Sequence, residues 1–326
     1  MNLTLKKWKI EGIDTLDKFK ECLVKINRTL EVDNWQGEPP RYSVTSNIEG
    51  NTEILDRNIK IENNEYRYIS FNIYIERARR AKSWHDSQGL LKDRKERVNV
   101  YQSNMIAFEE HGSISIITFS APTTVSRIFK HAFDSEELKD VMESSFNIKE
   151  DFLYWLLKRL RDYPNTDLYN NINVNISGLY GYLGSNGNND CRGNGRRVLA
   201  VLGTLAVIFS SEKLKSLRPE FQHNGNIVVI EINEDNTIKL YEDDYFGNFS
   251  VYTGQEKSNI LALYTINALL PMVLDAYNKN IADSLWSVEL KLDFLRTIGE
   301  EIKERVQEEL DSLEFASEEE EEDEEI

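Results

Sequence analysis

The chain has 326 residues, of which 40% are apolar and 10% aromatic, and it contains six prolines. This length and composition exclude a disordered or fibrous protein and predict two packed domains, or one large domain, with a sizeable core. Two cysteines, Cys22 and Cys191, are too few for a disulfide framework and fit no metal-binding spacing. No charged segment followed by an apolar one opens the chain, so we expect a cytoplasmic protein.

The formal net charge of −17 is distributed unevenly along the chain. Residues 1–200 carry 29 basic and 28 acidic side chains, whereas residues 201–326 carry 10 and 28. An anionic second half repels nucleic acid and anionic membranes, and it favours solubility or a basic partner. The carboxylates from Glu318 to Glu325 predict a disordered acidic tail over residues 316–326.

The first half opens with a predicted strand over Leu3–Ile10, followed by a run of antiparallel strands. Apolar and polar residues alternate in these segments, which is typical of strands with one buried face. The alternation is clearest at Ile69, Phe71, Ile73 and Ile75. The expected strands in this run are residues 42–48, 53–61, 66–76, 98–108 and 113–119.

Helices are predicted before and after this run of strands in the sequence. Asp14 is expected to cap a helix with one apolar face, formed by Leu16, Phe19, Leu23, Ile26 and Leu30. Further helices are expected near Pro122, after a capping box of Asp134 and Glu137, and over residues 149–163.

The second half is expected to be mainly helical. A glycine-rich loop over residues 178–195 leads into a helix at 197–209, and strands 227–232 and 237–241 form a predicted hairpin around Glu234-Asp235-Asn236. The apolar segment Ile260–Tyr277 has membrane-like length but contains Asn267, Pro271 and Asp275. These polar and helix-breaking residues favour a buried core helix, kinked at Pro271, over a membrane span.

The last predicted helix runs from about residue 283 to 314 and carries a narrow apolar stripe flanked by charge. Such a stripe fits either a neighbouring helix of the same chain, which we favour, or oligomerisation through residues 295–313. The stripe consists of Leu295, Ile298, Ile302, Val306, Leu310 and Leu313.

The fold class that these elements predict is α+β. We expect an antiparallel-sheet N-terminal domain with helices over residues 1–165, and then a mainly helical C-terminal domain containing a β-hairpin over residues 166–315. The disordered acidic tail over residues 316–326 completes the chain.

A basic connector over residues 77–97 holds eight Lys or Arg against three acids, together with a tryptophan. Arginine pairs with phosphates and an indole stacks on an unpaired base, so this segment suits a contact with single-stranded nucleic acid. A solvated basic connection is the alternative interpretation. The candidate contacts are Arg77, Arg79, Arg80, Trp84, Lys92, Arg94 and Lys95.

The glycine-rich segment 178–195 contains six glycines and is followed by Arg196, Arg197 and a helix. Backbone N–H groups and a helix N-terminus suit a phosphate, to which Arg192, Arg196 and Arg197 would contribute charge. The segment lacks the Walker A and dinucleotide-binding patterns. An ordinary surface loop is the alternative.

Acidic residues cluster on and after the predicted hairpin, including Glu231 and Asp243. They are compatible with the metal site of a metal-dependent hydrolase or nuclease, but acidic residues are also common in solvated turns. The four histidines, His85, His111, His131 and His223, have no zinc-binding spacing, and no catalytic serine motif is present. We therefore predict no metal site and no cofactor, and a function other than catalysis is favoured.

Three functions follow, in order of preference. The first is a non-enzymatic interaction protein, a subunit or accessory factor of a multi-protein assembly, whose protein partner offers a basic surface or a docking helix. The second is a nucleic-acid-binding protein that uses segments 77–97 and 178–197. The third is the metal-dependent hydrolase. The acidic tail is either solubilising or a weak, salt-screened mask for residues 77–97. No membrane partner is expected.

Overall fold

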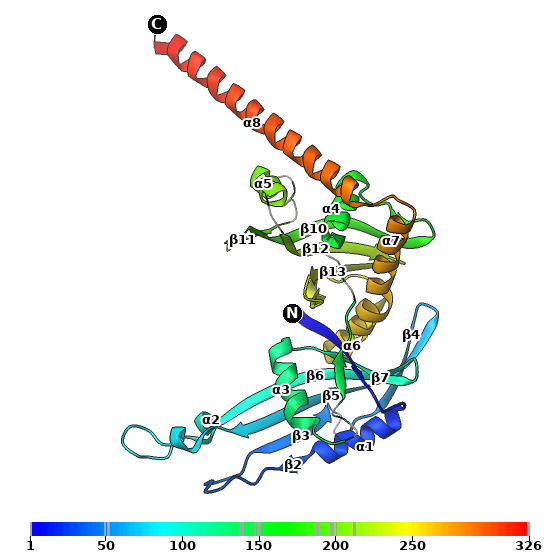
Figure 1. Cartoon of the computed structure of the whole chain (residues 1–326), viewed down its shortest axis with the longest axis vertical. Helices are drawn as coiled ribbons and strands as arrows, with labels where there is room; N and C mark the ends of the chain where they lie inside the picture. Colours follow the sequence, from blue (N-terminus) through cyan, green and yellow to red (C-terminus); the bar gives the residue numbers. More distant parts are fainter. Residues whose placement is uncertain are drawn as a thin grey trace. The chain divides into compact units, whose positions relative to one another are not determined.

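The computed structural model describes residues 2–48, 50, 53–136, 138, 140–146, 148, 151–186, 189–195, 199, 201–210 and 213–324, with side chains up to residue 313 (Figure 1). The chain divides into two compact units. The first comprises residues 1–146 and 237–270, and the second comprises residues 147–236 and 271–326. This division assigns residues 147–165 to the second unit, whereas the sequence-based boundary assigned them to the first domain.

The first unit contains an antiparallel sheet in which neighbouring strands follow the order β14-β1-β7-β6-β5-β3-β2. Strand β4 also pairs with β5, and β8 pairs with β1. The strands are β1 (Asn2–Ile10), β2 (Arg28–Thr29), β3 (Arg41–Ser46), β4 (Asp56–Ile61), β5 (Asn64–Ala78), β6 (Val98–Glu110), β7 (Ser113–Thr118), β8 (Val141–Glu143) and β14 (Ile238–Tyr241).

Helices α1 (Leu16–Ile26) and α3 (Pro122–Ala132) pack on one face of this sheet and share a core with it (Figure 1). The alternating residues of β5 point into that core, because Ile69, Phe71, Ile73 and Ile75 are all fully buried. The apolar face predicted for α1 is also buried, apart from the half-buried Leu30 that follows the helix. Burial of these side chains supplies the main stabilisation of the unit.

Two local predictions in this unit are wrong. The residue that caps α1 is Thr15, whose hydroxyl accepts a hydrogen bond from Lys18 N (3.4 Å), and not Asp14. Residues 141–143, in the region expected to be helical after Asp134, form β8 because they pair with β1, so tertiary pairing overrides the local helix signal. Glu137 of the expected capping box lies outside the described residues.

The second unit combines a four-stranded antiparallel ladder, β11-β10-β12-β13, with several helices. Its strands are β9 (Asp167–Tyr169), which pairs with β10, β10 (Ile172–Asn186), β11 (Asn189–Asn194), β12 (Lys213–His223) and β13 (Asn226–Asn233). Its helices are α4 (Phe152–Asp162), α5 (Leu202–Ser210), α7 (Leu270–Ala282) and α8 (Val288–Glu324).

These elements confirm the predicted α+β class. The two strands expected around residues 234–236 are present as β13 and β14. The second unit contains more strand than expected, because β10 occupies part of the expected glycine-rich loop and β12 occupies residues 213–223, for which no element was predicted. The side chains after residue 313 lie outside the described residues, so the disorder predicted for residues 316–326 stays a prediction.

The long apolar helix predicted near residues 258–278 is present as α6 (Gly254–Tyr264), a π-helical turn (Thr265–Leu269) and α7. The π-turn ends two residues before Pro271, whose ring nitrogen cannot donate to the helix ladder. Within the described residues this helix, Gly254–Ala282, is the one long and apolar enough to cross a membrane, and 67% of its most apolar window is buried. Such burial is typical of a core helix.

A carboxylate at the start of α4 organises the core of the second unit. Asp151 accepts hydrogen bonds from the Tyr277 hydroxyl (2.6 Å) and from the Trp286 indole (2.9 Å). Phe152 and Trp155 of α4 pack against the Tyr277 ring at centroid distances of 5.2 and 5.4 Å. These contacts fix α4 to α7 and to the start of the segment that leads into α8.

Candidate functional site

The basic connector, residues 77–97, joins β5 to β6 in the first unit and is called the basic lobe below. A short 3-10 helix, η1 (Ala81–Ser83), and a one-turn helix, α2 (Arg94–Arg97), bracket a turn at residues 86–89. Trp84 is 5% exposed, its indole donates to Arg79 O (2.8 Å), and its ring meets Trp35 edge-on at 5.1 Å. The indole face that the sequence assigned to base stacking is therefore enclosed by protein.

Two arginines of α2 hold the lobe together. Arg94 donates to both carboxylate oxygens of Glu76 (2.6 and 2.5 Å), and the Glu76 side chain is 2% exposed. Arg97 is also buried, with its guanidinium carbon 4.4 Å from the centre of the Trp35 ring. These two arginines stabilise the basic lobe, because both interact with side chains of the same unit, Arg94 with Glu76 and Arg97 with Trp35.

The other candidate contacts of the connector lie closer to solvent. Arg79, Arg80 and Lys95 are exposed, while Arg77 and Lys92 are half-buried. Arg77 faces a cavity that also receives side chains from β2 and α3, namely Arg28, Lys130 and His131. Sequence reasoning missed these three residues because they lie far from Arg77 along the chain.

The glycine-rich segment is not a loop. Residues 181–186 of β10 pair with 189–194 of β11 in an antiparallel hairpin, so the expected loop over 178–195 is corrected to two strands and a short connection. The glycines permit close packing: a Cβ on Gly193 would lie 2.2 Å from the Tyr182 ring, and one on Gly181 would lie 2.9 Å from Asn194 Oδ1.

The arginines of this segment do not form a described phosphate cradle. Arg192 is exposed on β11, opposite Leu183 of β10. Arg196 and Arg197 lie outside the described residues. The phosphate-binding hypothesis for this segment therefore rests on sequence alone.

Metal ligands do not gather in the part of the chain that the structure describes, since no group of three or more His, Cys, Asp or Glu side chains could hold an ion there. Glu231 lies buried on β13, and Asp243 lies in the 3-10 helix η3 (Glu242–Asp244). The acidic residues on which the metal-dependent hydrolase hypothesis was based therefore do not converge into a set of metal ligands among the described residues.

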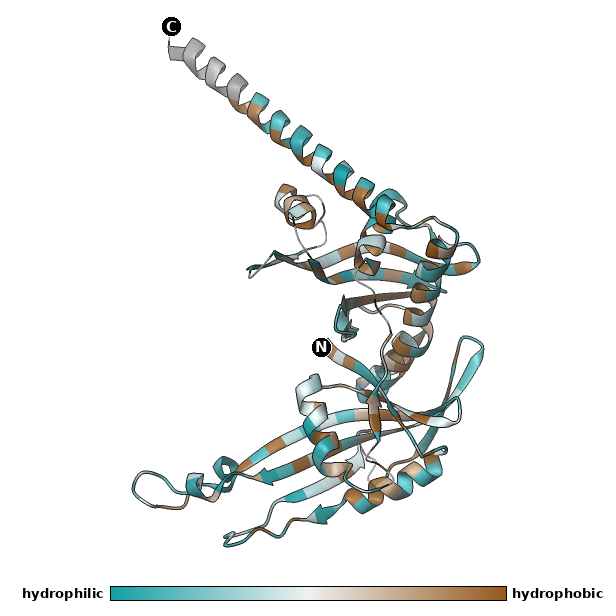
Figure 2. Ribbon diagram, in the orientation of Figure 1, coloured by the Kyte–Doolittle hydropathy of each residue, from teal (hydrophilic) through white to brown (hydrophobic). Residues whose placement is uncertain are grey.

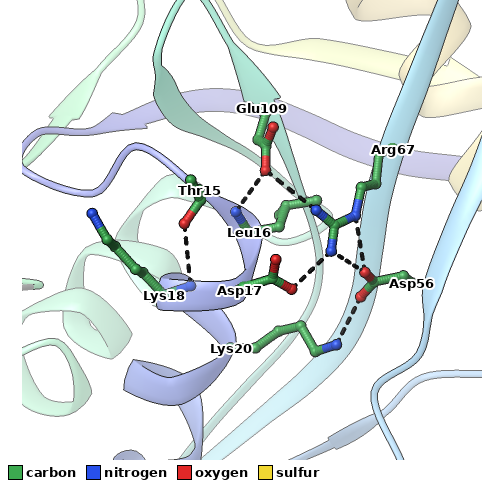
Figure 3. A network of polar contacts seen from close by, with 8 residues as sticks. All are labelled: Thr15, Leu16, Asp17, Lys18, Lys20, Asp56, Arg67 and Glu109. Carbon is green, nitrogen blue, oxygen red and sulfur yellow. Dashed lines mark hydrogen bonds and ion pairs between the residues drawn. The ribbon is translucent and has the colours of Figure 1, made fainter.

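A charged network surrounds Arg67 of β5 (Figure 3). Arg67 donates to Asp56 of β4 (Nε to Oδ2, 2.9 Å) and to Asp17 of α1 (2.8 Å). Glu109 lies 3.7 Å from Arg67 and accepts the backbone N–H of Leu16 (2.8 Å) at the start of α1. The hydrogen bonds that Arg67 donates to Asp56 and Asp17 raise its pKa. Because these charges compensate one another, the network ties α1 to β4 and β5.

Helix α8 carries the predicted apolar stripe, and its first part packs within the second unit. Phe294 and Ile298 are 4% and 1% exposed, and together with Leu157 of α4 and Leu205 of α5 they line a cavity of about 230 Å³. Gly299 permits this approach, because a Cβ there would lie 2.8 Å from the Phe209 ring of α5.

The second part of the stripe is uncovered. Val306, Leu310 and Leu313 are 40%, 49% and 66% exposed, whereas Ile298 in the first part of the stripe is 1% exposed. Figure 2 shows apolar positions recurring along α8 up to the part drawn in grey. Such a stripe of large aliphatic side chains at helical spacing is typical of a helix-docking surface.

Carboxylates flank this exposed stripe. Residues 300–313 carry six acidic and two basic side chains. Glu301 pairs with both basic residues that reach it, Arg305 of the same helix and Arg161 of α4. The surface beside Val306, Leu310 and Leu313 is consequently anionic.

No protein-family model matches the chain, and no curated protein sequence matches it either. The protein is an α+β protein of two compact units.

Proposed function

We propose that the protein is a non-enzymatic interaction subunit that binds a partner through the exposed stripe of α8, formed by Val306, Leu310 and Leu313. The exposure of these three side chains is the observation that carries the proposal. Their burial against a partner would stabilise the complex by about 25 cal/mol for each Å² of apolar surface removed from water.

The partner that fits this surface is an amphipathic helix with an apolar stripe flanked by Lys or Arg. The six acidic residues among positions 300–313 would attract such flanks and repel acidic ones. Self-association in parallel register would bring these carboxylates together, so a heterotypic partner is favoured over a second copy of the chain. Cytoplasmic location remains part of the proposal, in keeping with the reduced state expected of the two cysteines.

Two designed helical peptides test the chemistry of this surface. Both carry the same leucine stripe, but one has flanking lysines and the other has flanking glutamates. The full chain should bind the lysine peptide with micromolar affinity and bind the glutamate peptide at least about tenfold more weakly. Equal affinity for both peptides would remove the electrostatic part of the proposal, and absence of binding to either would remove the docking function.

Sedimentation equilibrium separates heterotypic docking from self-association. The chain should stay monomeric at micromolar concentration in low salt, where the carboxylates repel one another most strongly. A dimer that is lost in the Leu310→Lys variant would instead identify a second copy of the chain as the partner.

Nucleic-acid binding is the second candidate, favoured by the exposure of Arg79, Arg80 and Lys95 on the basic lobe. Enclosure of Trp84 makes phosphate contacts, and not base stacking, the expected mode. Filter binding of single-stranded and duplex nucleic acid across a salt series tests it, because phosphate contacts give a steep salt dependence. Absence of affinity at low salt would exclude it.

A further inference from the structure

A polar cavity of about 380 Å³ opens in the first unit where β2, β5 and α3 meet. Small-molecule sites commonly enclose about 300–1,000 Å³, so the cavity is large enough for a small ligand. Its polar lining includes Arg28, Arg77, Lys130 and His131, together with the carboxylates of Asp134 and Glu31. Leu30 and Val32 add an apolar side.

Arg77 is one of three cations that line this cavity. It is half-buried, and its Nη1 lies 2.6 Å from Nδ1 of His131. Burial, together with the charges of Arg77 and Lys130, lowers the pKa of His131, so the imidazole is neutral near pH 7 and accepts the Arg77 hydrogen bond. No carboxylate of the described residues forms an ion pair with Arg77. The positive charge of Arg77 is therefore in contact with a neutral imidazole ring and is not neutralised by an ion pair among the described residues.

Arg28 lines the same cavity and is held in place by contacts with its neighbours. It donates to Asp134 (2.6 Å) and to the backbone oxygen of His131 (3.3 Å), and its guanidinium lies 5.1 Å from the centre of the Tyr42 ring. Lys130 is exposed and has no ion-pair partner among the described residues. Three cations thus face two carboxylates, Asp134 and Glu31, which leaves a positive surplus centred on Arg77 and Lys130.

We propose that this cavity binds a phosphate monoester group, with Arg77 and Lys130 as its main ligands and Arg28, which is paired with Asp134, as a secondary cation. A phosphate monoester offers three strong acceptor oxygens and a charge of about −1.5 to −2 at pH 7. The remaining N–H groups of Arg77 match such oxygens in geometry, and a half-buried site strengthens the interaction. The group would come from a free phosphorylated metabolite or from the terminal phosphate of a nucleic-acid strand.

Calorimetric titration of the full chain with inorganic phosphate and with a nucleoside 5′-monophosphate tests the proposal. Arg77→Gln should weaken binding by about tenfold or more, which is the effect of losing one charge-assisted hydrogen bond in a partly desolvated site. Arg127→Gln is the matched control, since Arg127 is an exposed cation of α3 that does not line the cavity. It should change the affinity by less than about twofold.

Because Arg77→Gln removes a half-buried side chain, Lys130→Gln provides a second variant at an exposed position, and it should weaken binding severalfold in a folded protein. Proton NMR locates the site independently: bound phosphate should raise the pKa of His131, because the new negative charge favours the imidazolium. No phosphate binding to the wild-type chain, or equal losses in Arg77→Gln and Arg127→Gln, would overturn the proposal.

The source of the phosphate is resolved with two oligonucleotides of identical sequence, one with a 5′-phosphate and one with a 5′-hydroxyl. Selective binding of the phosphorylated strand, displaced by inorganic phosphate, supports the proposal and identifies a strand terminus. Binding of the nucleoside monophosphate without either strand supports it and identifies a small metabolite. Oligonucleotide binding that ignores the 5′-phosphate and survives Arg77→Gln would contradict it.

Discussion

Arg94 forms a two-pronged ion pair with Glu76, which is buried at the end of β5. The Tyr74 hydroxyl (2.7 Å) and the Arg41 backbone N–H (3.1 Å) complete the hydrogen bonding of the Glu76 carboxylate. The pair joins α2 to the central strands of the first unit. A basic residue that looks available for a ligand in the sequence is therefore a structural element of the basic lobe.

Replacing Arg94 should destabilise the protein. In Arg94→Gln the Glu76 carboxylate stays buried without its cation, and such a loss costs about 3–5 kcal/mol, with the partial exposure of Arg94 placing it at the lower end. Urea denaturation followed by tryptophan fluorescence measures the change. Lys95→Gln, at the exposed neighbouring position, should change the unfolding free energy by less than about 0.5 kcal/mol. Similar values for the two variants would show that the pair is not structural.

Glu110 gives the first unit a predictable response to acid. Burial raises the pKa of Glu110, but the hydrogen bond from Lys7 (2.7 Å), its charge and the Ser115 hydroxyl outweigh this effect, so the pKa lies below its usual value of 4.5. A lowered pKa in the folded state contributes stability that is complete above pH 4.5 and is lost as the pH falls through the lowered value.

The difference in unfolding free energy between wild type and Glu110→Gln should therefore shrink as the pH falls from about 6 to about 3. Chemical denaturation across that range measures it. Glu65→Gln, at an exposed position of β5, is the control and should show a nearly constant difference. A gap between wild type and Glu110→Gln that grows in acid would contradict the sign of the pKa shift.

The network around Arg67 should make the attachment of α1 sensitive to this one residue (Figure 3). Arg67→Gln removes the cation that Asp17 and Asp56 share and leaves Lys20 as the described cation paired with Asp56 (2.8 Å). Compared with the wild type, Arg67→Gln should accelerate amide hydrogen exchange in α1 more than in the centre of the sheet. Lys18→Gln breaks an exposed pair with Asp14 and should leave that exchange unchanged.

Local periodicity predicted much of the first unit. The apolar faces of α1 and β5 were correct because spacings of three to four and of two residues follow directly from helix and strand geometry. The sequence did not predict β8, since residues 141–143 become a strand through pairing with β1 and not through their own propensity.

Glycine content misled the interpretation of residues 178–195. Gly181 and Gly193 are typical of a loop in sequence, but here they allow β10 and β11 to approach each other beside Tyr182. The sequence also revealed only one of the three cations of the proposed phosphate site. Arg77 was recognised from the basic connector, whereas Arg28 and Lys130 join it only when β2, β5 and α3 come together.

The exposed stripe of α8 can be tested in living cells by placing a photo-crosslinking amino acid at position 310 and, as the control, at position 308 on the opposite face of the helix. Both positions are exposed, and they lie on opposite faces of α8. A difference in crosslinking therefore shows which face contacts the partner. We predict a discrete crosslinked complex with one partner protein from position 310, lost when Val306 is replaced by Lys, and none from position 308. Crosslinks of equal yield from both positions, or none from position 310, would contradict the docking function.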